Sequence, residues 1–154
     1  MIKKILMVIG ALTIIGVIVL VGGTYYVGNK ITGELEKREP EFRQYVIMTT
    51  EEQNAYVSKN VDAFYNLISS LAGESDEELA EFQTVMKQLD SDPEIFQAKV
   101  NWGRSIVATF ILANENIRKD LSADVLKKLQ EEKNAKDTNY LEYKKLINEY
   151  KLKQ

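Results

Sequence analysis

The sequence SIVATFILA, from Ser105 to Ala113, is the most apolar stretch of the chain after residue 30. Nine helical residues span about 14 Å, which is too short to cross a hydrocarbon core of about 30 Å. A buried helix at the centre of the fold is therefore the better interpretation. This helix should begin at Pro93, with Asp92 as its N-cap, and run to about Ile117.

Apolar residues around this central helix recur at helical spacing, and no segment after residue 30 shows the sustained alternation of a strand. Three apolar stripes follow from the spacing: Val57, Val61, Phe64, Ile68 and Leu71; Leu79, Phe82, Met86 and Leu89; and Tyr140, Tyr143, Ile147 and Tyr150. We therefore expect an all-α fold, an antiparallel helical bundle of about four helices.

Start and stop signals divide the chain between these stripes. Thr49 or Thr50 is the expected N-cap of the first long helix, and TEEQ at 50–53 fits a capping box. A second box is SDEE at 75–78, after a terminator at Gly73. Ser122 should cap a later helix, and Asp137 or Thr138 should open or interrupt the last one.

The N-terminus carries a different signal, because Ile5 to Gly28 contain no charged residue. These 24 residues would form a helix of about 36 Å, long enough to cross a bilayer with some tilt. Tyr25 and Tyr26 stand where an aromatic belt would meet the headgroups. A cleaved signal peptide is the alternative, with a poor cleavage site at 22–24. The apolar residues expected to face lipid are Ile5, Leu6, Val8, Ile14, Ile15, Val17, Ile18 and Leu20.

Lys3 and Lys4 flank the start of this segment, and positive charges there predict that the N-terminal end lies in the cytoplasm. The expected topology is a single-pass anchor at 1–29, a juxtamembrane helical connector at 30–48 and a helical bundle domain at 49–154. The bundle would then lie outside the cytoplasm, in the periplasm or at the cell surface.

Composition argues against several classes of function. The chain has no Cys and no His, so thiol catalysis, thiolate metal sites and histidine bases are excluded. Its net charge is −3, and −5 without Lys3 and Lys4, which gives no electrostatic footprint for nucleic acid. The acidic pairs Glu51-Glu52, Glu77-Glu78 and Glu131-Glu132 are the candidates for acid–base catalysis or Ca²⁺ binding. The first two pairs lie in first helical turns, where carboxylates are favoured anyway. We expect no cofactor, no metal and no enzymatic activity.

Aromatic residues are the remaining candidates for a binding site. Trp102 is followed by Gly103 in mid-helix, where Gly costs roughly 1 kcal/mol; a close helix approach explains it, and a ligand pocket near Trp102 is the functional alternative. The amphipathic tail EYKKLINEYKLKQ favours a partner contact through Tyr143, Leu146 and Tyr150. Packing within the bundle is the structural alternative for these side chains.

Several short motifs resemble the LemA family of bacterial proteins. NLISSLAG at 66–73, followed by ESDEELAEF, is similar to that family's NLV-x-x-V-x-G-like helix with acidic residues after it. DLSADVLKKLQEE at 120–132 and DTN at 137–139 match later family segments in order, although NAYVSKNVDAFY lacks the family's tryptophan and basic cluster. The resemblance implies an N-terminal membrane helix with a helical bundle outside it, and no settled enzymatic activity.

The expected function is a membrane-anchored interaction or scaffold protein, an accessory subunit of a bacterial envelope or membrane complex. Its partners would be the lipid bilayer and one or more proteins, or further copies of itself. The alternative is an extracytoplasmic small-molecule-binding or sensory module. An exposed apolar surface would favour the first function, and a pocket with convergent polar groups would favour the second.

Overall fold

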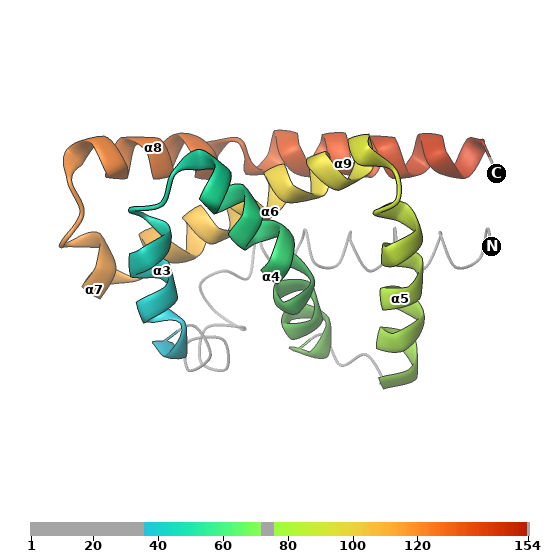
Figure 1. The fold of residues 1–154 in the computed structure, drawn as a ribbon, viewed down its shortest axis with the longest axis horizontal. Helices are drawn as coiled ribbons and strands as arrows, with labels where there is room; N and C mark the ends of the chain where they lie inside the picture. The colour runs from blue at the N-terminus through green and yellow to red at the C-terminus, as the bar shows by residue number, and fades with distance from the viewer. Residues whose placement is uncertain (1–35, 72–75, 154) are drawn as a thin grey trace.

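The structure, a computed structural model, describes residues 36–71 and 76–153, without the side chains of 64–71, 76, 78, 79, 81 and 82. Within these ranges the chain forms seven α-helices and no strand, which confirms the all-α prediction. Figure 1 shows their arrangement. The helices are α3 (Glu39–Tyr45), α4 (Thr50–Leu71), α5 (Asp76–Leu89), α6 (Pro93–Ala113), α7 (Glu115–Arg118), α8 (Ala123–Asn134) and α9 (Lys136–Leu152).

Helix α6 is the centre of the fold, as the sequence predicts. It contacts α4, α7, α8 and α9, and most of its apolar stretch is buried: Ser105, Ile106, Val107, Ala108, Ile111 and Leu112. Asp92 is its N-cap and accepts hydrogen bonds from the N–H groups of Glu94 and Ile95. The helix ends at Ala113, earlier than predicted, because Asn114 adopts an extended backbone and caps the short α7 through Ile117 N–H.

Helices α8 and α9 follow one another almost in line and run antiparallel to α6 (Figure 1). Ser122 caps α8 by accepting a hydrogen bond from Val125 N–H, as predicted. The interruption between the two helices lies at Ala135, before the predicted Asp137 or Thr138. Ala135 keeps a right-handed helical backbone, and no side chain caps the start of α9.

Helix α4 packs across α6 through the apolar stripe that contains Val57 and Val61, both of which are buried. Its capping box is one residue earlier than predicted: Thr49 Oγ1 accepts from Glu52 N–H, and Glu52 Oε2 accepts from Thr49 N–H. Met86 and Leu89 of the second stripe are also buried. The other predicted members of these two stripes, together with Gly73 and Ser75, lie outside the described residues or side chains: Phe64, Ile68, Leu71, Leu79 and Phe82.

The predicted connector at 30–48 is helical in its described part, where α3 packs on the bundle. Phe42 and Tyr45 on α3 are fully buried in the main core cluster. Arg43 fastens the helix further by donating to Asp120 Oδ2 and to the carbonyl oxygen of Asn116. Pro40 stands in the first turn of α3, which agrees with the fresh helix start that proline favours there.

No helix in the described ranges is both long and apolar enough to cross a membrane. The predicted anchor, 1–29 with Tyr25 and Tyr26, lies outside the described residues.

Candidate functional site

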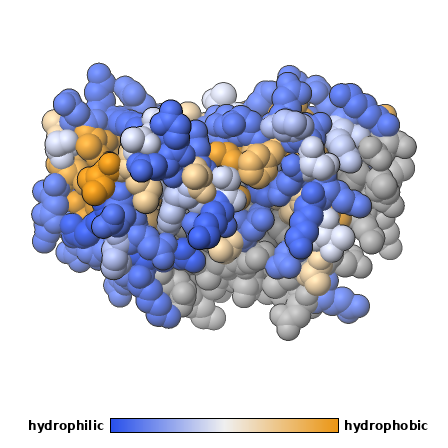
Figure 2. Space-filling view, in the orientation of Figure 1, coloured by the Kyte–Doolittle hydropathy of each residue, from blue (hydrophilic) through white to orange (hydrophobic). Residues whose placement is uncertain are grey.

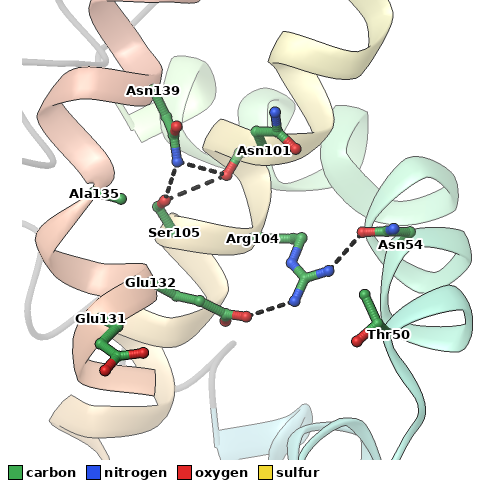
Figure 3. A pocket seen from close by; sticks show the side chains of 9 residues that line it. All are labelled: Thr50, Asn54, Asn101, Arg104, Ser105, Glu131, Glu132, Ala135 and Asn139. Atoms are coloured by element: carbon green, nitrogen blue, oxygen red, sulfur yellow. Dashed lines mark hydrogen bonds and ion pairs between the residues drawn. The ribbon is translucent and has the colours of Figure 1, made fainter. Parts of the chain in front are cut away.

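A polar pocket of about 470 Å³ opens on one face of α6, where α4, α8 and α9 meet it (Figure 3). Volumes of roughly 300–1,000 Å³ are usual for small-molecule sites. The pocket is rich in amide and charged groups although it adjoins the apolar core. Its lining residues are Thr50, Asn54, Asn101, Arg104, Ser105, Glu131, Glu132, Ala135 and Asn139.

Arg104 joins three helices at the floor of this pocket. Its Nη1 donates to Asn54 Oδ1 at 2.7 Å, and its Nη2 donates to Gln53 Oε1 at 3.1 Å and to Glu132 Oε1. The side chains of Arg104 and Glu132 are only 13% and 17% exposed. Because little water reaches the pair, its hydrogen bonds hold α4, α6 and α8 more firmly than a surface ion pair would.

A second set of hydrogen bonds lines the α9 side of the pocket. Asn139 Nδ2 donates to Ser105 Oγ at 2.8 Å and to the carbonyl oxygen of Asn101 at 3.3 Å. Ser105 Oγ in turn donates to the same carbonyl at 3.3 Å. Figure 3 shows these groups on the opposite side of Arg104 from Asn54 and Thr50.

Two buried polar atoms beside Arg104 have no hydrogen-bond partner among the described residues: Tyr45 Oη and Glu132 Oε2. Burial, and then the charge of Glu132, raise the pKa of Tyr45 above its usual value. The phenol therefore stays a neutral donor, and the carboxylate oxygen is an acceptor. Buried polar atoms of this kind are normally satisfied, often by a bound water molecule.

Lys99, also on α6, is the second unusual group. Its side chain is 1% exposed, and Nζ lies 2.7 Å from both Asp62 Oδ1 and Asp90 Oδ2. Nζ is also 6.0 Å from the centre of the Phe96 ring. Burial raises the pKa of Asp90, while the ammonium group of Lys99 opposes that rise. The cluster ties α4 and the residue that follows α5 to α6, and its surface side is the half-exposed Asp62.

A third feature is the α3–α4 groove, a hollow of about 740 Å³ between those two helices. Ile47, in the turn between them, is 77% exposed. Met48, Ala55 and Tyr56 extend the apolar lining. Figure 2 shows hydrophobic surface at the end of the molecule that carries α3 and α7. The remaining lining residues are polar or charged: Glu41, Gln44, Glu52, Lys59 and Asn60.

Trp102 itself does not line the pocket predicted near it, whereas its neighbours Asn101, Arg104 and Ser105 do. The side chain of Trp102 is 1% exposed and packs against the rings of Tyr140 and Tyr143, with centroids 5.1 and 5.8 Å away. The indole ring is therefore part of the core. The close helix approach predicted at Gly103 is confirmed, because a Cβ there would lie 2.7 Å from Val57 Cγ1.

The predicted partner contact through Tyr143 is wrong. Tyr143 is fully buried, and its hydroxyl group donates to Met86 Sδ at 3.6 Å. Leu146 and Tyr150 are half-buried and line a hollow of only about 20 Å³ against the first turn of α6. The tyrosine face of α9 therefore packs mainly within the chain.

The sequence pointed to Glu132 only as half of the acidic pair Glu131-Glu132, and it did not point to Arg104, Asn54 or Asn139 as site residues. One signal was present: Asn101, Arg104 and Ser105 occupy one helical face of the otherwise apolar α6, at spacings of three and four. A polar face on a central helix needs buried partners. Which helices supply those partners depends on packing, which the spacing does not reveal.

Among the described residues, no group of three or more His, Cys, Asp or Glu is arranged to hold a metal ion. The resemblance to the LemA family stays a prediction. No family model matches the chain, and neither a curated protein nor a solved structure shows significant similarity to it.

Proposed function

We propose that this chain is a membrane-anchored helical bundle that docks onto another protein, as an accessory or scaffold subunit of a bacterial envelope or membrane complex. The apolar run from Ile5 to Gly28 supports the anchor, and Lys3 and Lys4 support a cytoplasmic N-terminus. Anchoring raises the effective concentration of the bundle near partners in the same membrane.

The observation that carries the docking function is the exposure of Ile47 in the α3–α4 groove. A large aliphatic side chain that is 77% exposed, beside Met48 and Tyr56, gives the groove an apolar centre. Its charged rim gives it the anatomy of a protein interface. Glu41 and Glu52 outnumber Lys59 on this rim, so the partner should present an apolar side chain flanked by basic residues.

The test is a photo-crosslinking amino acid placed at position 47 of the full-length chain in its native membrane. We expect a cross-link to one defined protein, identified by mass spectrometry. The cross-link from position 47 should be lost when the same chain also carries Ala55→Glu, a charge placed at an exposed position in the groove lining. Leu152, which is 86% exposed on α9, is the matched control position. Equal cross-linking from positions 47 and 152 would contradict a specific groove. A cross-link to a second copy of the chain would replace the heteromeric partner by a homo-oligomer.

The anchor has its own test. An alkali-washed membrane fraction should retain the full-length chain, because an uncleaved apolar helix resists extraction. Recovery of a soluble form that begins near Thr24 would show a cleaved signal peptide instead.

A second candidate function is binding of a small molecule outside the cytoplasm. It is favoured by the pocket of about 470 Å³ around Arg104, called the Arg104 pocket below. Polar groups from four helices converge there, as expected of a ligand site. The docking groove and this pocket involve different parts of the bundle, so the two functions are separately testable.

A further inference from the structure

The two walls of the Arg104 pocket carry different chemical groups. Figure 3 shows Glu131 and Glu132 on the α8 wall, with Arg104, Asn54 and Thr50 across from Glu131. The α8 wall therefore offers carboxylate acceptors. The facing wall offers a guanidinium, an amide and a hydroxyl group.

The charge of Arg104 is already matched by Glu132, which it contacts directly. Glu131 is exposed at the rim, and no hydrogen bond or ion pair of its side chain is found among the described residues. Lys128 lies outside the lining and donates to Gln53 Oε1 at 3.3 Å. The lining thus keeps one unmatched negative charge, that of Glu131.

Donor groups remain on the opposite wall. A guanidinium has five N–H bonds, and Arg104 uses three of them, for Asn54, Gln53 and Glu132. Its Nε–H and one Nη1–H remain. Asn54, which also lines the pocket, accepts from Arg104 through Oδ1, so its Nδ2 group is left as a donor.

These placements call for a ligand that donates from a positive group at one end and accepts at the other. We propose that the pocket binds a small molecule with a primary ammonium group next to a carbonyl group, as in an amino acid amide. The ammonium group lies at Glu131, and the carbonyl oxygen accepts from Arg104 and Asn54. This inference rests on the second candidate function above and is independent of docking at Ile47.

The experiment uses the full-length chain in mild detergent and phosphate buffer, free of amine buffers, with isothermal titration calorimetry. The probes are L-glutaminamide, which has the ammonium group, N-acetyl-L-glutaminamide, which lacks it, and N-acetyl-L-glutamine, an anion. We expect saturable binding of L-glutaminamide and at least about ten-fold weaker binding of both acetylated probes, since a charged hydrogen bond is lost.

The variant Glu131→Gln should weaken L-glutaminamide binding by about five- to ten-fold. Its unfolding curve should match that of the parent, because this side chain is exposed and makes no described contact. Glu142→Gln, an equal charge change at an exposed site on α9 outside the lining, should leave binding unchanged. Preferred binding of N-acetyl-L-glutamine would overturn the ammonium assignment but keep a small-molecule site. Binding of no probe would overturn both.

Discussion

Gly103 on α6 lies so close to Val57 on α4 that a Cβ at position 103 would stand 2.7 Å from Val57 Cγ1. Val61 Cγ2 would be 3.0 Å from the same atom. A β-branched side chain in a helix has one strongly preferred rotamer, so Val57 cannot turn away. The glycine is therefore a requirement of the α4–α6 contact.

We predict that Gly103→Ala lowers the free energy of unfolding by about 1–2 kcal/mol, even though Ala is the better helix former by about 1 kcal/mol. Urea unfolding followed by circular dichroism measures this. The double variant with Val57→Ala should be more stable than the sum of the two single changes indicates. A Gly103→Ala protein as stable as the parent would contradict the contact.

Arg104→Ala should destabilise the bundle by about 2–3 kcal/mol, because Glu132 would lose its cation while still largely shielded from water. Arg104→Lys should recover less than half of that loss, since an ammonium group cannot reproduce the planar fork that reaches Asn54, Gln53 and Glu132 together. Thermal or urea unfolding measures both variants. The control is Lys145→Ala, which removes an exposed pair with Glu149 and should change stability by less than about 0.5 kcal/mol.

Lys99→Met should destabilise the protein at pH 7, with a loss that shrinks as the pH falls toward 4. Burial raises the pKa of Asp90, and removal of Lys99 leaves that effect unopposed. A carboxyl group whose pKa is raised on folding contributes stability below its unfolded pKa, about 3.9, and loses it as the pH rises through the folded pKa. Unfolding of parent and variant across pH 4–7 tests this.

The double variant Lys99→Met/Asp90→Asn should be less dependent on pH and more stable at pH 7 than Lys99→Met, because no uncompensated carboxylate remains at position 90. Asp62→Asn should have a smaller effect than either, since Asp62 is 53% exposed. A loss in Lys99→Met that is equal at pH 4 and pH 7 would contradict the role assigned to Asp90.

Tyr56 should make the protein sensitive to alkali. Burial, and then its hydrogen bond to Glu41, raise the pKa of Tyr56 to about 12. The neutral phenol therefore contributes stability that is present below the unfolded pKa, about 10, and is lost as the pH rises through 12. The stability difference between the parent and Tyr56→Phe should shift against the parent by about 1–2 kcal/mol between pH 9 and pH 12. Lysine deprotonation affects both proteins equally and cancels in this comparison.

Trp102 is the only tryptophan of the chain, so its fluorescence reports directly on the α6–α9 core. Its emission should be blue-shifted and poorly quenched by iodide in the folded protein. Tyr143→Ala should cost about 3–5 kcal/mol and expose Trp102 to quenching. Tyr143→Phe should stay within about 1 kcal/mol of the parent, because the hydroxyl donates only to a weak sulfur acceptor at 3.6 Å. If Tyr143→Ala changed neither the free energy of unfolding nor the quenching of Trp102, the buried position of Tyr143 would be contradicted.

Local signals in the sequence were sufficient for much of the fold. The apolar run at 105–113 predicted the central helix, and Asp92 and Ser122 predicted two helix starts, because capping depends on groups within a few residues. Helical periodicity predicted the buried faces of α4 and α9 for the same reason: an apolar stripe must find cover.

Long-range packing decided what those signals could not. Only the tertiary structure brings Asn54, Arg104 and Glu132 together, since they come from three helices separated by 50 and 28 residues. The tertiary structure also places Tyr143 in the core and α3 in the bundle. Periodicity could not predict this, because an apolar face can be covered either by the same chain or by another protein. The sequence by itself thus determined which helices form and which faces are apolar. The packing of α4, α8 and α9 around α6 determined which polar groups meet, because a side-chain network requires atoms within about 3 Å and no local pattern encodes that distance.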